Sequence, residues 1–356
     1  MLTRINIENF RGFKKLELND CKKFNLVLGK NNVGKTALLE ALFLHIGSKN
    51  PELISKINAF RGIFPIPLKI ESLWNPLFYN YDSSKIIFIN SDDSNHKTRR
   101  LEIKLASING SKILQQKEKK DQERETSITT STISQNKIEL KYYDPSNNYS
   151  SSFAIMEKEG IRLENSMNSD LQGIFVFSQG RRGGSEDAER YADLDVKRET
   201  SDIINILQKV EPRLRRLSVV PQGSESNVYG DIGISRSIPI QLMGEGTSKL
   251  LSLSLAITVF KNGIVLIDEV ENGLHYSIMR EVFSALKELA KKYNVQIFAT
   301  THSNECVHAL YESYGESDPD DISFIRLDRV EGEIKSVNYD KRSLDTIFET
   351  GWEIRG

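Results

Sequence analysis

The sequence predicts an α/β fold with a mixed sheet whose core is parallel, and three stretches lead to this prediction. Residues 24–28 form a short apolar run before a glycine-rich loop and a segment with helical spacing of apolar residues. Residues 263–267 form a second apolar run, which ends in two acids. Residues 295–300 form a third run after a helical pattern at 277–292, which completes a strand–helix–strand unit. Sites in such sheets lie at the carboxyl ends of the strands, so these stretches predict one shared site.

The glycine-rich loop at 29–36 reads Gly-Lys-Asn-Asn-Val-Gly-Lys-Thr and fits the pattern of a phosphate-binding loop, G-x-x-x-x-G-K-[ST]. Backbone N–H groups of such a loop, with the amino end of the following helix, surround phosphate oxygens. We expect Lys35 to reach the β and γ phosphates and the Thr36 hydroxyl to bind Mg²⁺. The alternative is a glycine turn that only joins a strand to a helix. The residues expected to bind the nucleotide here are Asn31, Asn32, Val33, Gly34, Lys35, Thr36 and Ala37.

Composition excludes some classes of protein. The chain of 356 residues has 48 Lys and Arg against 49 Asp and Glu, so no global basic field indicates nucleic acid. Cys21 and Cys306 are far apart in sequence, which favours two core residues in a reducing compartment over a disulfide or a zinc site. The amino terminus carries no secretory signal, and the apolar run at 250–260 is too short to span a bilayer. We therefore expect a cytoplasmic protein without a membrane partner.

The amino-terminal segment alternates apolar and polar residues, which predicts a first strand ending at Phe10 and a second at 16–18. Arg11 lies in the turn between them. It is a candidate contact for a phosphate or a base of the nucleotide, and the alternative is an exposed arginine at the end of a strand.

An antiparallel β lobe is predicted as an insertion at 49–178. Within it, residues 107–136 are rich in polar and charged residues that cannot build a core, so we expect a flexible loop. Contact of its lysines with nucleic acid is disfavoured by interspersed acids and by the lack of aromatic residues. The strands expected in this region are 85–90, 99–105, 137–143, 152–156 and 173–177.

A helical segment is predicted at 179–216, with one helix running from 186 to 210 and ending before Pro212. The cluster Arg213, Arg215 and Arg216 follows it, either as a DNA contact or as a solvated surface. We expect a single bilobed domain over 1–356. Its nucleotide-binding core comprises 1–48 and 217–356.

The carboxyl-terminal half supplies the acids that a phosphate-binding loop needs for catalysis. Asp268 follows the buried strand and is expected to hold Mg²⁺, while Glu269 acts as the general base for an attacking water. His302 follows the next strand, where an imidazole can touch the γ-phosphate or that water. Acids that merely end a strand and a structural histidine are the alternatives.

A second glycine-led helix begins near Gly244-Glu245-Gly246-Thr247 and is apolar on nearly every side. The amino end of such a helix attracts an anion. Because the first loop already holds the phosphates of one nucleotide, we expect Gly246 and Thr247 to serve the nucleotide of another subunit.

The order of these motifs resembles the ABC-type ATPase heads of the SMC and RecF class, and more narrowly the OLD-like (overcoming lysogenization defect) AAA-type ATPases of bacterial anti-phage systems. The resemblance covers most of the chain except the β lobe. It implies an ABC-type P-loop ATPase head that forms a head-to-tail homodimer or a higher oligomer around ATP and Mg²⁺. The motifs that carry it are the loop at 29–36, Gly244-Glu245-Gly246-Thr247, Ile267-Asp268-Glu269, Glu271-Asn272-Gly273-Leu274-His275 and Thr301-His302-Ser303.

Further roles come from the resemblance alone. It makes 272–275 the D-loop, His302 the switch histidine and Gln179 a Q-loop glutamine at the metal. Gly244 stands where ABC signatures have serine and Glu245 where they have glycine, so the contact of that serine with the γ-phosphate cannot be transferred. Too few residues follow His302 for the Toprim nuclease domain of full OLD proteins.

The function expected from these features is a slow ATPase that acts as a switch. If the chain resembles the anti-phage systems, its nucleotide state regulates a separately encoded effector, a nuclease that could be of the Toprim type. The alternative is a RecF-like repair ATPase that binds DNA itself. A GTPase is the third possibility, but the guanine-reading pattern Asn-Lys-x-Asp is absent from the sequence.

Overall fold

The computed structural model describes residues 1–62, 71–106, 137–157, 160–177, 184–314, 321–339 and 343–346. The predicted flexible loop at 107–136, Gln179 and the last residues of the chain lie outside the described residues.

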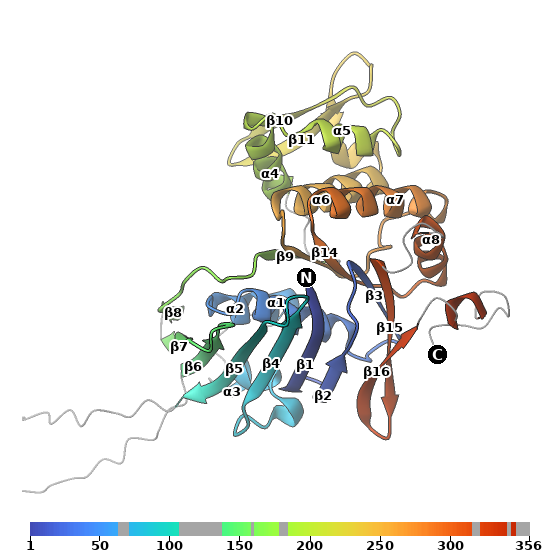
Figure 1. Ribbon diagram of the computed structural model, residues 1–356. Helices are drawn as coiled ribbons and strands as arrows, with labels where there is room; N and C mark the ends of the chain where they lie inside the picture. Colours follow the sequence, from blue (N-terminus) through green and yellow to red (C-terminus); the bar gives the residue numbers. More distant parts are fainter. Residues whose placement is uncertain are drawn as a thin grey trace, which may run out of the picture.

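A six-stranded mixed sheet forms the centre of the molecule (Figure 1), in the order β16-β15-β3-β14-β13-β9. All neighbours run parallel except β15 and β16, which form an antiparallel hairpin. The three strands predicted from apolar runs lie side by side in it, as expected. Its strands are β3 (Phe24–Leu28), β9 (Gly173–Val176), β13 (Ile264–Ile267), β14 (Gln296–Thr300), β15 (Ile322–Val330) and β16 (Glu333–Tyr339).

Both faces of this sheet are buried, which explains why its strands are continuous apolar runs. Along β3, Leu26 packs into the hydrophobic cluster on one face and Val27 into the cluster on the other. Strand β13 repeats this alternation with Val265 and Leu266. The period of two that a strand imposes on its side chains thus divides each run between two cores.

Helices cover the two faces (Figure 1): α6, α7 and α8 lie on one, and α1 lies on the other. Helix α6 is buried nearly all round, as its sequence predicts, because α4 (Gly184–Val196), α5 (Ser201–Leu207) and α7 pack against it. Cys21 and Cys306 are both free and buried in these cores. The bounds of the helices are α1 (Lys35–Ile46), α6 (Glu245–Val259), α7 (Tyr276–Lys292) and α8 (Asn304–Tyr314).

A second, seven-stranded antiparallel sheet packs below α1, in the order β2-β1-β4-β5-β6-β7-β8. It extends beyond the predicted insertion at 49–178, because the two amino-terminal strands complete it, whereas β9 belongs to the central sheet. Its strands are β1 (Leu2–Phe10), β2 (Phe13–Leu18), β4 (Ile87–Asp93), β5 (Thr98–Ala106), β6 (Lys137–Tyr143), β7 (Tyr149–Glu157) and β8 (Gly160–Glu164). The short helices nearby are α2 (Glu52–Phe60), α3 (Glu71–Trp74), η1 (Asn75–Leu77) and η2 (Tyr79–Tyr81).

The helical segment differs from its prediction. The single helix expected at 186–210 is wrong, because the chain forms α4 (Gly184–Val196) and α5 (Ser201–Leu207). Arg198 adopts a left-handed conformation with φ of 59°. The N–H groups of Arg198 and Glu199 bond back to Asp195 and Leu194, each at 2.9 Å. These two backbone hydrogen bonds form the Schellman motif that ends helices. An arginine here takes the left-handed position that glycine usually occupies.

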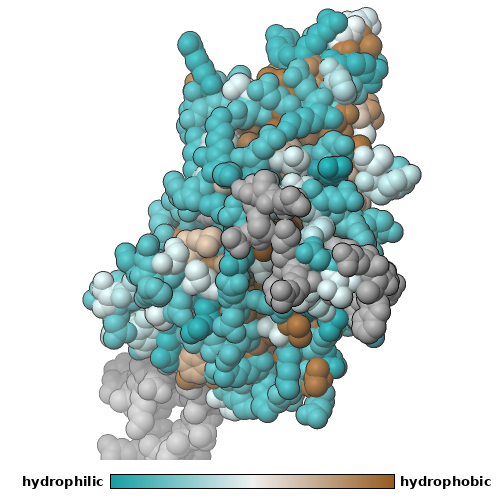
Figure 2. Space-filling model, turned by 45° about the vertical axis from the view of Figure 1, so that its right-hand side comes forward, coloured by the Kyte–Doolittle hydropathy of each residue, from teal (hydrophilic) through white to brown (hydrophobic). Residues whose placement is uncertain are grey.

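A small β unit follows these helices and completes a lobe on the far side of α6 (Figure 1). It comprises β10 (Arg216–Gln222), β11 (Glu225–Asp231), β12 (Ile238–Pro239) and η3 (Ile240–Met243). Figure 2 shows a mostly hydrophilic face whose hydrophobic surface gathers toward the top, where Figure 1 places this lobe. None of the helices in the described part of the chain is long and apolar enough to cross a membrane.

Candidate functional site

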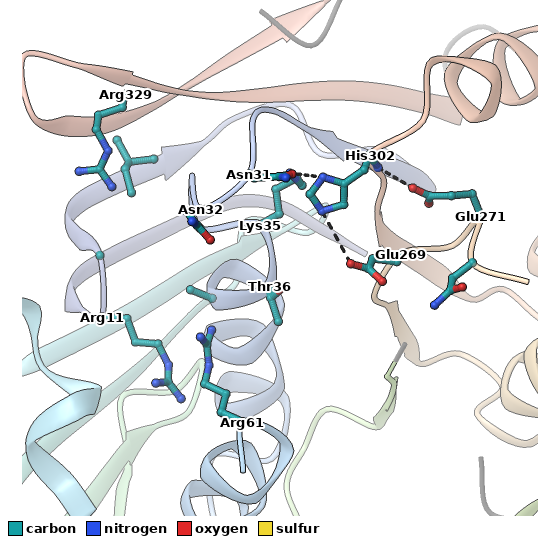
Figure 3. A pocket seen from close by; sticks show the side chains of 15 residues that line it. Arg11, Asn31, Asn32, Lys35, Thr36, Arg61, Glu269, Glu271, His302 and Arg329 are labelled. Atoms are coloured by element: carbon teal, nitrogen blue, oxygen red, sulfur yellow. Dashed lines mark hydrogen bonds and ion pairs between the residues drawn. The ribbon is translucent and has the colours of Figure 1, made fainter. Parts of the chain in front are cut away.

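A cavity of about 860 Å³ opens at the carboxyl ends of the central strands, where the sequence predicts a shared site. Its size suits a small polyphosphate ligand. Figure 3 shows charged side chains entering it from the loop after β3, from the ends of β13 and β14, and from the opposite wall. The predicted residues that line it are Arg11, Asn31, Asn32, Gly34, Lys35, Thr36, Ala37, Glu269 and His302.

The loop at 29–36 depends on glycine at two positions. Gly29 has φ of +135°, and a Cβ there would lie 2.5 Å from the carbonyl oxygen of Leu327 on β15. Gly34 has φ of +100°, and a Cβ there would lie 2.9 Å from the ring of Phe13. Gly34 also caps α1 without a side-chain bond, so the first N–H groups of the helix stay open for an anion.

Lys35 is held by the loop itself. Its Nζ donates to the carbonyl oxygens of Gly29 at 2.5 Å and Lys30 at 2.9 Å, and lies 3.3 Å from Nδ1 of His302. Burial lowers the pKa of Lys35 to about 8, against the opposing charges of nearby acids. The Lys35 ammonium group is therefore already oriented across the loop before a phosphate binds.

Thr36, Asp268 and Thr300 form a bonded chain of oxygen groups. The Thr36 hydroxyl donates to the Asp268 carboxylate at 3.1 Å, and the Thr300 hydroxyl donates to Oδ1 of Asp268 at 2.7 Å. Burial raises the pKa of Asp268, although both hydroxyl bonds oppose the shift. A hydroxyl and a carboxylate are hard oxygen donors that fit Mg²⁺ bound jointly with a phosphate. Among the described residues no group of three or more His, Cys, Asp or Glu residues could hold a metal ion by itself.

Glu269 and His302 face each other across the mouth of the cavity. Nε2 of His302 lies 3.8 Å from Oε1 of Glu269, and their side chains are 39% and 30% exposed. With Lys35 protonated, Nδ1 of His302 must accept, so we assign the ring proton to Nε2, toward Glu269. Glu269 has a left-handed φ of 48°, and its N–H is fixed by a 2.9 Å bond to the Thr300 hydroxyl. Such a backbone conformation is uncommon for a residue other than glycine and is found at functional sites.

Glu271 is a site residue for which the sequence predicts no separate role. Its Oε1 accepts a 2.6 Å bond from the backbone N–H of His302 (Figure 3), which ties the loop after β13 to the loop after β14. The available signal was its position two residues after Glu269.

The wall opposite His302 carries Arg11, Arg61 and Arg329. Arg11 was predicted, but Arg61 and Arg329 lie in no motif and reach the cavity only through the fold. Behind Arg11 and Arg61 lies the buried carboxylate of Glu40 on α1.

Some predicted residues do not line the cavity. Val33 is buried beside Gly29, and Asp268 reaches the site only behind Thr36. Gly246 packs against Ile278 at the start of α6, so neither it nor Thr247 lines the cavity of the same chain. Their contact with another subunit's nucleotide stays a prediction. Gln179 lies outside the described residues.

Comparison with known proteins places this site in a family. Residues 24–307 match the family described as "AAA domain, putative AbiEii toxin, Type IV TA system". The match contains the loop at 29–36, both acids after β13 and His302.

Curated proteins and solved structures also resemble the chain. It is 26% identical over 336 residues to an ATP/GTP phosphatase of Helicobacter pylori, covering 89% of this chain and 90% of that protein. A shorter match, 41% over 75 residues, joins 20% of this chain to 21% of the DNA replication and repair protein RecF of Nitrosococcus oceani. An SMC head bound to the C-terminal winged-helix domain of ScpA has a TM-score of 0.52 at 14% identity, covering 97% of this chain and 99% of that one. The fold is that of an ABC-type P-loop ATPase head.

Proposed function

Since the chain belongs to the AAA-domain family described above, we propose that it binds ATP with Mg²⁺, hydrolyses it slowly and uses its nucleotide state as a switch. The observation that carries this proposal is the meeting of Lys35, Thr36, Glu269 and His302 in one cavity. The similarity to a protein named ATP/GTP phosphatase supports hydrolysis.

Each of these residues has a separate role in the proposed reaction. Lys35 and the N–H groups at the start of α1 stabilise negative charge on the phosphates. Glu269 takes a proton from the attacking water as the water oxygen bonds to the γ-phosphorus and the bond from that phosphorus to the β–γ bridging oxygen breaks, releasing ADP and phosphate. The Nε2 proton of His302 orients the same water or the γ-phosphate.

Mg²⁺ would be held by Thr36 and Asp268, with the nucleotide phosphates completing its shell. When bound, the ion supplies charge neutralisation on the phosphate oxygens. The Thr300 hydroxyl keeps Asp268 in place through its bond to Oδ1. Oδ2 makes no bond to Thr300.

We propose that the active assembly is a head-to-tail dimer. Its support is the amino end of α6, where Gly246 and Thr247 begin a helix without lining the chain's own cavity. Exposed Leu242 lies in η3, just before this helix, and exposed Tyr276 begins α7, which packs against α6. We expect native mass spectrometry to find a dimer with non-hydrolysable ATP and a monomer without it. An unchanged mass in both states would contradict nucleotide-driven dimerisation.

The output of the switch is proposed to be control of a separate effector. The resemblance to OLD-like anti-phage ATPases supports a nuclease, and the family description raises a toxin–antitoxin setting as well. Co-expression with the product of the neighbouring gene tests this idea. We expect a complex whose nuclease activity depends on nucleotide state, and the absence of both complex and activity would count strongly against the proposal.

A RecF-like DNA-binding role is the second candidate, favoured by the local match to RecF. Its predicted basic cluster is partly neutralised, because Arg213 donates two 2.9 Å bonds to Glu211. If the role is correct, DNA affinity falls steeply with salt and is lost on replacing Arg213, Arg215 and Arg216. Parallel ATP and GTP turnover assays address the third possibility, a GTPase.

A further inference from the structure

Glu40 is a charged residue placed inside the protein. It lies on α1, four residues after Thr36, so both side chains point from the same face of the helix. Its side chain is 0% exposed. A buried carboxylate is stable only when other groups satisfy its oxygens and balance its charge.

Two arginines from different segments pair with its charge, and Arg61 bonds both of its oxygens. Nε of Arg11, in the turn between β1 and β2, lies 2.6 Å from Oε2 of Glu40. Arg61, which caps the end of α2, approaches with Nε at 2.6 Å from Oε1 and Nη2 at 3.0 Å from Oε2. Arg11 also reaches Asn58 through Nη2, at 3.4 Å.

The charges in this cluster do not balance. One carboxylate meets two guanidinium groups, and Arg11 is only 9% exposed, while Arg61 is 39% exposed. Both arginines line the cavity, and Figure 3 shows their guanidinium groups converging beside the helix that carries Thr36. Burial lowers the pKa of Arg11 to about 10 even though Glu40 opposes the shift. The cluster therefore has one positive charge that an anion in the cavity would neutralise.

We propose that Glu40 is a positioning residue that fixes Arg11 and Arg61 as a pair, so that both present N–H donors to the polyphosphate of the nucleotide. This inference rests on the proposed nucleotide site. Glu40 touches no nucleotide in this arrangement and acts only through the two arginines. A single helix thereby places Lys35 and Thr36 at one end of the phosphates and, one turn later, orients the arginines of the opposite wall.

A double-mutant cycle on affinity tests the role, because it separates positioning from stability. Glu40→Asp keeps the charge but is one methylene shorter, so its oxygens cannot hold both guanidinium groups. The Kd of Mg²⁺ with non-hydrolysable ATP is measured by calorimetry for Glu40→Asp, Arg61→Gln and the double variant. Asp93→Asn is the matched control, since it breaks a 2.9 Å pair with Arg99 on the antiparallel sheet, outside the cavity.

We expect each single variant to raise Kd about tenfold, as loss of one charged hydrogen bond does. The double variant should raise Kd by less than the product of the two single effects, because Glu40 acts in part through Arg61, and Asp93→Asn should bind as the wild type does. A wild-type Kd for Glu40→Asp, or a Kd raised by the product of the single effects, would overturn the inference.

Two further outcomes are distinguishable. If Glu40→Asp does not fold, as judged by circular dichroism, a wild-type Kd for the half-exposed Arg61→Gln still overturns the inference. If the wild type itself does not bind the nucleotide, the proposed function fails, whatever the variants do.

Discussion

The affinity for nucleotide should depend on pH through Lys35. Burial lowers the pKa of Lys35 to about 8, from 10.5 in an unfolded chain. A polyphosphate binds the protonated form, so binding above pH 8 must first restore the proton. From pH 7.5 to pH 9.5 the protonated fraction of a group with a pKa of 8 falls roughly 25-fold, and we expect Kd to rise by about that factor.

The assay is calorimetric titration of non-hydrolysable ATP with Mg²⁺ between pH 7.5 and 9.5. The nucleotide adds no titration of its own, since the second phosphate pKa lies near 6. Lys35→Arg is the control, because a guanidinium stays charged throughout and should give a nearly flat profile at a weaker absolute affinity.

The free energy of unfolding should change with pH in the direction opposite to the affinity. The folded pKa of Lys35 lies below its unfolded value, so between pH 8 and 10.5 the unfolded chain holds the proton more strongly. The contribution of Lys35 to the free energy of unfolding therefore rises with pH in this window, while affinity falls. A wild-type Kd that stays constant from pH 7.5 to 9.5, or an equal rise in Lys35→Arg, would refute the reasoning.

Three further substitutions test the site. Glu269→Gln should reduce hydrolysis by about 10²- to 10⁴-fold while ATP still binds, and single-turnover hydrolysis at the wild-type rate would exclude Glu269 as the general base. Thr300→Val removes the bonds to Asp268 and to the Glu269 N–H, so we expect about 1–3 kcal/mol less stability in denaturant unfolding; an unchanged midpoint would contradict this. Gly29→Ala should cost about 1–3 kcal/mol, because its Cβ meets the Leu327 carbonyl at 2.5 Å, whereas Gly332→Ala, also at positive φ, meets nothing within 4 Å. Equal losses of unfolding free energy in both alanine variants would show that the contact with Leu327 is unimportant.

Local sequence determined the elements whose patterns are self-contained. The strand, loop and helix around Lys35 follow from an apolar run, two glycines and helical spacing within a few residues of each other. Asp268 and Glu269 were placed in the same way, because a buried parallel strand delivers whatever follows it to the carboxyl edge of the sheet. The prediction of a single helix at 186–210 was wrong because the helix breaks at Arg198. Arginine is not a residue type that indicates a left-handed conformation.

Only the tertiary structure decided which distant residues meet. Arg61 reaches the cavity because α2 packs beside α1, and Arg329 because the β15–β16 hairpin pairs with β3. Glu40 reads in sequence as one more polar position on a helix, yet the closure of β1, α1 and α2 buries it between two arginines. A sequence pattern indicates the secondary structure of the one segment that contains it. The charge balance of a buried cluster depends on segments that approach from different parts of the chain.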